Sequence, residues 1–418
     1  MPRSSPYERL GVPEIINAVG HATRLGGSRP AAEVVAAMEA ASLAFIEIDD
    51  LQAAASRIIA ECTGAEAGIV TCGASAALAL AAAACLAGND PDRMDRLPDV
   101  SDCPRFETIH PRPGPYDYDH AIRLSGARLI TIDYAAPAAL AEIARAIGPR
   151  TAAVAHVCHA GVDGVPLPAL VELAHRHDLP VIVDAAIALP PAENLRAVTA
   201  QGADLVAYSG GKHLGGPQAS GILCGRAHLI RSAWAQMVDM DVRPGTWSLQ
   251  SWVDAGWIAR PPRHGIGRAM KVGKEAVIGL LTALELYAHR DHAAERAAWI
   301  SRTIAIAAGL AGLEGLRVQT LLGDPESRRY PAVMIESESS TGGIGVPGLL
   351  RQLRRLPRKI LLSEDERSPD RAYIYPACLS DDDAVEVVAS IRAILTAHSR
   401  NPRPDAPEPG GSVSAPPG

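Results

Sequence analysis

The residues best placed to do chemistry together in this sequence are a lysine and an aspartate. Lys212 lies in the glycine-rich run YSGGKHLGGPQASG, directly after an apolar segment, and Asp184 ends the apolar segment LPVIVD, 28 residues earlier. Because the carboxyl ends of neighbouring parallel strands meet at one crevice, this spacing allows both side chains to reach one small ligand. The spacing is equally compatible with a strand-ending aspartate and a lysine in a surface loop.

A lysine and a carboxylate in this arrangement are the pair that pyridoxal 5'-phosphate (PLP) requires. The lysine forms a Schiff base with the cofactor, and the carboxylate keeps the pyridine nitrogen protonated so that the ring can accept electrons from a substrate carbanion. Glycines in the same run are expected to let the cofactor approach the backbone, namely Gly210, Gly211, Gly215 and Gly216.

A third element points to the phosphate of such a cofactor. The run GIVTCGASAALALAAAA predicts a strand, a turn of small residues (Cys72, Gly73, Ala74 and Ser75) and a helix. A turn that opens a helix presents free N–H groups and the positive end of the helix dipole to an anion. Ser209, three residues before the lysine, can add a hydroxyl to the same phosphate. The alternatives are an ordinary helix cap at the turn and a capping role for Ser209.

The elements that must position these residues alternate between strands and helices. From about residue 65 to 230, short apolar runs such as TAAVAHV and ADLVAYS are separated by helical patterns such as LPALVELAHRH, which predicts a largely parallel α/β sheet covered on both faces. The expected organisation is an N-terminal arm (1–20), a large domain (21–270), a linking helix over 268–291 with a small α+β C-terminal domain (271–398), and a disordered tail (399–418).

Composition excludes several classes of partner. The net charge of −7 without a long basic run argues against nucleic acid or an anionic membrane surface. Seven cysteines occur singly without CxxC pairs, which favours a reducing cytosol. The start of the chain has no apolar signal-peptide core, and the run AALALAAAACLAG is too short to cross a bilayer. We therefore expect a soluble cytoplasmic protein.

The run YSGGKHLGGPQASGILCGR resembles the lysine segment of the selenocysteine synthase (L-seryl-tRNA selenium transferase) family. Further segments, including EIINAVGHATRLGG and GIGRAMKVGKEAVIGLLTALELY, resemble the D-glucosaminate-6-phosphate ammonia-lyase-like proteins of the same clan. The resemblance implies a fold-type-I, aminotransferase-like PLP enzyme in which Lys212 forms the Schiff base, Asp184 pairs with the pyridinium and residues 72–75 hold the phosphate. Relatives with an additional N-terminal region act on tRNA, and we expect no tRNA substrate here.

One segment departs from these relatives. Many carry Gly-His shortly before a segment like YDHAIRLSGAR, and that histidine is expected to stack on the cofactor ring, whereas here Pro113 and Gly114 occupy the corresponding positions. The ring is then covered by His110, Arg112 or Tyr116.

Other polar residues have possible roles at such a site. His159 follows a strand and is a candidate acid, base or cofactor contact. The metal interpretation of the run HVCH is poor, because its residues lie on opposite strand faces, and we expect no metal. Candidate substrate contacts, each of which is alternatively a surface residue, are Arg24, Tyr118, His120, Arg268, Lys271 and Arg371.

The sequence thus predicts a PLP-dependent enzyme, a homodimer or higher oligomer, that acts at Cα of a small amino acid or amino sugar acid, with an anionic substrate as one alternative. After the substrate amine displaces Lys212, the released lysine is the expected base for the Cα proton. Elimination of a β-hydroxyl and hydrolysis of the resulting enamine then release ammonia and a 2-oxo product, as in a C–N/C–O lyase. The alternatives are an oxidative decarboxylase in natural-product biosynthesis and, from another class, a PLP-binding partner protein without turnover.

Overall fold

The computed structural model divides the chain into two compact units. It describes residues 5–112, 116–133, 139–158, 165–238, 243–323, 330–338 and 344–400, apart from the side chains of Arg112, Ser399 and Arg400. Unit 1 holds residues up to Gly20 and those from Ala293 onward, and unit 2 holds His21–His292. The predicted boundaries differ from this division, because the helix after residue 271 belongs to unit 2 and the N-terminal arm belongs with the C-terminal residues.

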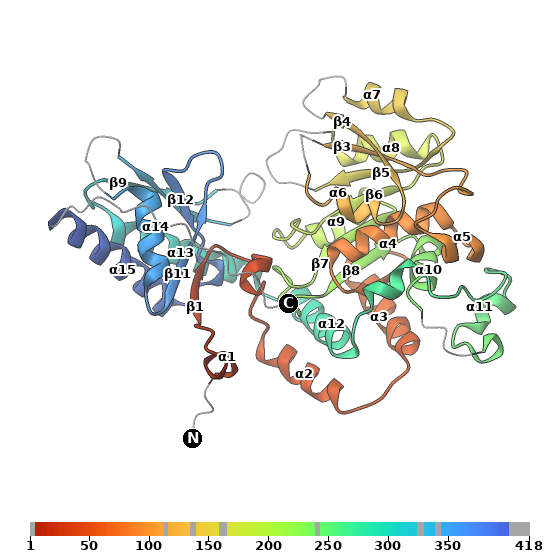
Figure 1. Cartoon of the computed structure of the whole chain (residues 1–418), viewed down its shortest axis with the longest axis horizontal. Helices are drawn as coiled ribbons and strands as arrows, with labels where there is room; N and C mark the ends of the chain where they lie inside the picture. Colours follow the sequence, from red (N-terminus) through yellow and green to blue (C-terminus); the bar gives the residue numbers. More distant parts are fainter. Residues whose placement is uncertain are drawn as a thin grey trace, which may run out of the picture. The chain divides into compact units, whose positions relative to one another are not determined.

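Unit 2 is built on a seven-stranded sheet in the order β2-β8-β7-β6-β5-β3-β4. Figure 1 shows β4, β3, β5, β6, β7 and β8 following one another across this sheet. The strands are β2 (Ala67–Thr71), β3 (Glu107–Arg112), β4 (Arg128–Asp133), β5 (Thr151–Val157), β6 (Val181–Asp184), β7 (Leu205–Ser209) and β8 (Gly221–Gly225). The pairs from β4 through β7 are parallel, and β8 runs antiparallel to both of its neighbours. The predicted strands of this domain are confirmed.

Helices cover both faces of the sheet, as the alternation of its side chains requires. Val181, Val183 and Val206 join a core with α3, α7, α8, α9 and α12, whereas Ile182 and Leu205 join a second core with α4, α6 and α10. The longer helices are α2 (Ala32–Ser42), α3 (Ile48–Thr63), α4 (Ala74–Ala87), α7 (Ala139–Ala146), α8 (Leu167–His175), α9 (Asn194–Ala200), α10 (Ala227–Ala235) and α12 (Lys274–Ala288). The short ones are η1 (Thr23–Leu25), α5 (Pro91–Arg96), α6 (Asp119–Arg123), η2 (Pro244–Thr246), α11 (Gln250–Asp254) and η3 (Ile266–Met270).

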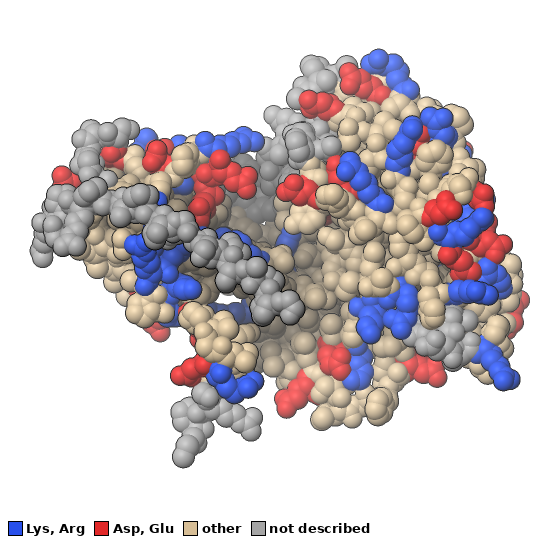
Figure 2. Space-filling view, viewed as in Figure 1, with Lys and Arg blue, Asp and Glu red and all other residues tan. Residues whose placement is uncertain are grey.

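The alanine-rich run after β2 forms α4, the most deeply buried helix of unit 2. Eleven of its 14 residues are buried, because a helix that is apolar on every side needs neighbours all round it. Among the described residues, none of the helices has both the length and the apolar character needed to cross a bilayer. On the face shown in Figure 2, the cationic and anionic side chains of unit 2 are interspersed.

The predicted linking helix over 268–291 is wrong in its bounds. The chain forms η3 and then an extended stretch, since Lys271 and Gly273 have ψ angles of 146° and 151°, and α12 begins only at Lys274. Lys271 and Lys274 are therefore not neighbours on one helix face.

Unit 1 is an α+β unit with a five-stranded sheet in the order β1-β11-β12-β10-β9. β1 pairs parallel with β11 and the other pairs are antiparallel. Its elements are α1 (Pro6–Arg9), β1 (Ile15–Ala18), α13 (His292–Leu310, whose first residue belongs to unit 2), β9 (Leu316–Leu321), β10 (Ala332–Ser337), α14 (Gly345–Arg355), β11 (Lys359–Glu364), β12 (Arg371–Ile374), η4 (Pro376–Cys378) and α15 (Asp381–Arg400). The predicted tail lies outside the described residues from residue 401 onward.

Candidate active site

Lys212 lies in a tight turn that connects β7 to β8. The turn is closed by backbone hydrogen bonds from the Gly210 amide to the Ser220 carbonyl (2.9 Å) and from the Gly216 amide to the Gly210 carbonyl (2.9 Å). The Gly215 amide also donates to the Lys212 carbonyl (3.0 Å). These bonds hold the backbone of the lysine in a defined place.

The glycines of this turn allow the protein to pack closely on itself. A Cβ on Gly210 would lie 2.2 Å from the Ser220 hydroxyl oxygen and 2.6 Å from a Leu280 methyl group, and one on Gly211 would lie 2.4 Å from the Gln218 Cα. The sequence led us to expect that these glycines admit the cofactor to the backbone. For Gly210 and Gly211, the described contacts give another reason, which is close packing against residues 218–220 of the same connection and against Leu280 of α12.

Asp184 and Lys212 interact across the carboxyl ends of β6 and β7. Asp184 is 5% exposed, and its carboxylate accepts hydrogen bonds from the Ala186 amide at Oδ1 (2.9 Å) and from the Tyr116 hydroxyl at Oδ2 (2.5 Å). Burial lowers the pKa of the Lys212 amine, and attraction to Asp184 opposes that shift. The structure thus brings together the acid and the lysine that the sequence selected.

The turn at residues 72–75 reaches the same sheet edge. Gly221 at the start of β8 pairs with Thr71 of β2 on one side and with Ser209 of β7 on the other. Gly73 precedes α4 with φ 141°, and no side chain caps the helix. The first amides of α4 therefore keep the donor groups that suit a phosphate.

Comparisons with known proteins agree with this arrangement. The family model of L-seryl-tRNA selenium transferase matches residues 47–243. The chain is 32% identical over 405 residues to 5'-C-glycyluridine monooxygenase-decarboxylase of a Streptomyces species, covering 95% of this chain and 93% of that one. It is 31% identical over 395 residues to D-glucosaminate-6-phosphate ammonia lyase of Salmonella typhimurium, covering 93% and 97%. The chain belongs to the family that unites L-seryl-tRNA selenium transferase with D-glucosaminate-6-phosphate ammonia-lyase-like enzymes.

The fold of this selenium transferase family member is that of the fold-type-I, aminotransferase-like PLP-dependent enzymes. A solved D-glucosaminate-6-phosphate ammonia-lyase matches it with a TM-score of 0.78 at 28% identity, covering 95% of this chain and 100% of that one. The predicted family and fold class are confirmed, and so is the prediction that the chain is an enzyme, because its named relatives are a lyase, transferases and a monooxygenase-decarboxylase.

The predicted cofactor contacts near β3 lie around Tyr116. His110 is 1% exposed and forms a hydrogen bond through Nδ1 with Asp119 (3.0 Å), and its ring meets Tyr116 edge-on. Tyr118, 49% exposed, has its ring centroid 5.5 Å from that of Tyr116, and His120 is exposed on α6. Pro113, Gly114, the Arg112 side chain and His159 lie outside what the structure describes.

Two further predictions concern the turn at 72–75 and the N-terminal loop. Burial raises the pKa of the Cys72 thiol, which suits a packing role. Arg24 is exposed on η1, but its loop is tied to the lysine turn, because the Gln218 side chain donates to the Thr23 carbonyl (2.6 Å). A Cβ on Gly27 of this loop would lie 2.4 Å from the Gly211 carbonyl oxygen.

Arg268 and Lys271 line a cavity of about 400 Å³ in unit 2. Its other lining residues are Glu47, Ile48, Asp49, Gln52, Trp234, Met237, Val238 and Val272. Asp49 is engaged by the Trp234 indole N–H (2.9 Å) and by the Ser248 hydroxyl. Neither Lys212 nor Asp184 lines this cavity. The substrate role of Arg268 and Lys271 therefore stays a prediction.

Arg371 lies on β12 in unit 1 and has carboxylate partners there. Its guanidinium contacts Glu336 (2.7 Å) and Asp365 (3.7 Å). A substrate carboxylate would have to compete with both, so this structure does not favour the predicted role.

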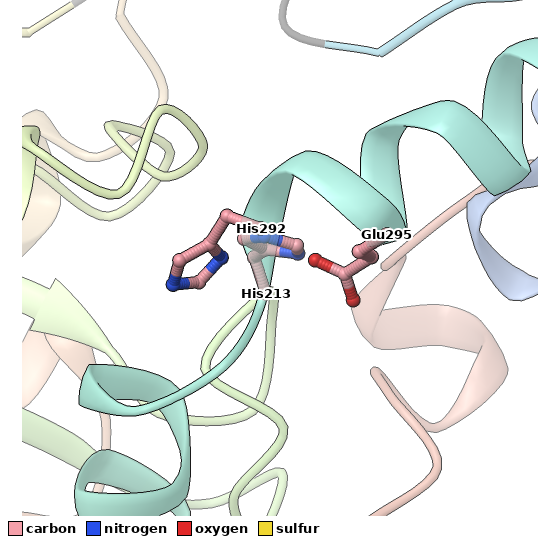
Figure 3. A group of neighbouring side chains, drawn as sticks. All are labelled: His213, His292 and Glu295. Carbon is pink, nitrogen blue, oxygen red and sulfur yellow. The ribbon is translucent and has the colours of Figure 1, made fainter.

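A group of histidines near Lys212 was not predicted from the sequence. The His213 ring lies 5.8 Å from that of His21 and edge-on to Tyr287 at 5.4 Å. Figure 3 shows His213 with His292, the first residue of α13, and with Glu295 one turn later on that helix. Glu295 belongs to unit 1, whereas His21, His213 and His292 belong to unit 2. The sequence signal was the position of His213 directly after the lysine.

Burial keeps His213 and His21 neutral. It lowers the pKa of His213 to about 2, with further lowering by His21, Arg290 and His292. It also lowers the pKa of His21 to about 4, with further lowering by Arg290 and Lys212. Neither histidine therefore carries a positive charge at neutral pH.

Replacing Gly211 with alanine should destabilise the protein. The new Cβ meets the Gln218 backbone, which cannot move aside as a flexible side chain would, and overpacking of this kind costs about 1–3 kcal/mol. Denaturant unfolding measures the change. Gly148→Ala is the matched control, because a Cβ there meets nothing within 4 Å. Equal stability of the two variants would contradict the packing role.

Acid should destabilise the protein through the buried histidines. Their folded pKa values lie below the ordinary 6.5, so the unfolded chain binds more protons and stability is lost as the pH falls below 6.5. The loss is about 1.4 kcal/mol per pH unit for each histidine until its folded pKa is reached. Unfolding free energies at pH 7 and 5 should differ less in His213→Gln, whereas exposed His177→Gln should keep the wild-type difference.

Proposed function

We propose that this protein is a PLP-dependent enzyme that acts at Cα of an amino substrate, and that it is a C–N/C–O lyase releasing ammonia. The observation that carries the proposal is the strand register at Gly221. Gly221 pairs with Ser209, which precedes the turn of Lys212, and with Thr71, which precedes the start of α4, so these parts lie at one end of the sheet. Asp184 lies at the same end of the sheet, because β6 pairs parallel with β7 and β7 leads into the turn of Lys212.

The residues present fit the cofactor. Lys212 offers an amine whose pKa burial has lowered, Asp184 offers a carboxylate to the pyridine nitrogen, and Ser209 with the uncapped amides of α4 offers donors to the phosphate. When bound, PLP supplies an electron sink for a bond broken at Cα.

Lys212 is the proposed base of the reaction. Its lowered pKa increases the fraction of neutral amine near neutral pH, so that Nζ can accept the Cα proton. Loss of a β-hydroxyl with its bonding electrons then removes water, and later hydrolysis returns water and releases ammonia. The net conversion is from a 2-amino-3-hydroxy acid to a 2-oxo acid and ammonia.

The substrate class follows from the relatives and from the cavity at Arg268. One relative's name gives a phosphorylated glucosaminate and another's a glycyl group on uridine, so both join an amino acid group to a sugar framework. We propose an amino acid of this kind, carrying an anionic group that Arg268 and Lys271 would bind.

Oxidative decarboxylation is the second candidate. The relative that is 32% identical over 95% of this chain is named a monooxygenase-decarboxylase. In that reaction the Cα–carboxylate bond breaks in place of Cα–H, and O2 is the oxidant. Lys212 and Asp184 would serve both reactions.

The setting is expected to be a reducing cytosol, because the seven cysteines occur singly in the sequence, without CxxC pairs. We also propose a homodimer or higher homo-oligomer, without nucleic acid or membrane partners.

The two reactions are separated by their products. The PLP-loaded protein is screened with 2-amino-3-hydroxy acids, including sugar-derived ones, while ammonia and O2 are measured together. We expect ammonia without O2 uptake, and O2 uptake with CO2 release would select the second candidate. Lys212→Ala should lose the visible absorbance of lysine-bound PLP and lose roughly 10²–10⁴-fold in rate. If no substrate turns over although PLP binds, the result supports a non-catalytic PLP-binding protein.

Neutralising Lys271 should weaken substrate binding. A hydrogen bond to a charged group contributes about 1.5–3 kcal/mol, so Lys271→Gln should raise KM roughly tenfold or more with little change in kcat. Lys359→Gln is the control, because Lys359 is an exposed lysine on β11 in unit 1. An unchanged KM in Lys271→Gln would contradict substrate binding by Lys271 and would support its interpretation as part of a solvated basic surface.

A further inference from the structure

The Asp184 carboxylate is held by two donors from different parts of the chain. Oδ1 accepts the amide hydrogen of Ala186, two residues later, at 2.9 Å, and Oδ2 accepts the hydroxyl hydrogen of Tyr116, 68 residues away, at 2.5 Å. The terminal torsion of an aspartate is broad, so one bond alone leaves the carboxylate plane loosely defined. One donor on each oxygen fixes that plane.

The Tyr116 hydroxyl acts as a permanent donor. Burial raises the pKa of the phenol, and the charge of Asp184 and the hydrogen bond to it raise the pKa further. The phenol is therefore protonated at neutral pH, where its hydroxyl donates to Asp184. A carboxylate has about four acceptor positions, so the two bonds leave acceptor capacity for another donor.

The ring of Tyr116 is itself supported by its neighbours. The His110 ring meets it edge-on, with the ring centroids 5.7 Å apart. The centroid of the Tyr118 ring, two residues later in the sequence, lies 5.5 Å from that of Tyr116. His110 is fixed in turn by its hydrogen bond with buried Asp119, the first residue of α6. Contacts thus continue from α6 through His110 and Tyr116 to Asp184.

We propose that Tyr116 is a positioning residue for the cofactor. Together with the Ala186 amide, its hydroxyl holds the Asp184 carboxylate in one orientation, so that the pyridine N–H of PLP meets a fixed acceptor. This inference rests on the proposed PLP function, and it assigns the residues around YDHAIR to the support of the carboxylate. His110, on this account, acts through Tyr116.

The experiment measures PLP binding by the cofactor-free protein. Wild type and Tyr116→Phe are titrated with PLP, followed by the visible absorbance of the lysine-bound cofactor, and the absorbance of each loaded protein is recorded against pH. Loss of a hydrogen bond to a charged group should raise the Kd of Tyr116→Phe roughly tenfold or more. It should also move the pH profile of the absorbance, because the carboxylate that faces the pyridine nitrogen has lost one partner.

Tyr373→Phe is the matched control, since the Tyr373 hydroxyl donates to Asp365 at 3.1 Å in unit 1. This variant removes the same kind of tyrosine–aspartate bond and should leave both the Kd and the pH profile unchanged. Thermal unfolding of the cofactor-free proteins reports any general loss of stability in either variant.

The outcomes separate this inference from the proposed function. If wild type does not bind PLP, the proposed function fails. If wild type binds PLP and Tyr116→Phe binds it with an equal or lower Kd, the positioning role is overturned while the proposed function stands. If Tyr116→Phe is less stable but keeps the wild-type Kd and pH profile, Tyr116 is structural only, which also overturns the inference.

Discussion

The candidate site depends on how closely β8 approaches the first turn of α4. Gly221 lies between Thr71 and Ser209 in the sheet, and a Cβ at this position would be 2.5 Å from the Gly73 carbonyl carbon and 2.7 Å from the Ala74 nitrogen. Only glycine permits this approach without moving the backbone. The strand that leaves the lysine turn is therefore held directly against the turn that begins the helix, and the lysine, Ser209 and the helix amides share one edge.

Two opposing electrostatic effects act on the lysine at that edge. Burial disfavours its charged form, and Asp184 favours it, with burial the larger effect. His213 and His21 are neutral, so they add no positive charge that would disfavour the protonated lysine further. A lysine that exchanges its proton easily is suited to imine formation as well as to proton transfer. The packing that fixes the backbone of the turn thus also buries the Lys212 side chain and lowers the pKa of its amine.

The sequence predicted the strands and the pairing of Lys212 with Asp184, because both follow from local patterns and from the rule that parallel strands end at one edge. It did not predict the partners of Asp184 and His213. Tyr116 reaches Asp184 from 68 residues away, and His21 reaches His213 from the N-terminal loop, so neither contact has a local signal. The break between η3 and α12 was also missed, since the helical spacing of apolar residues predicted one continuous helix over 268–291.

Relatives that share this fold are named for different reactions, so the lysine and the aspartate do not by themselves decide which bond is broken. That decision requires groups that orient the substrate relative to Lys212. The N-terminal loop is one part of the chain that contacts the lysine turn, through the Gln218–Thr23 hydrogen bond and the approach of Gly27 to Gly211. A substitution in the loop that carries Arg24 therefore acts on the turn of Lys212 through these two contacts.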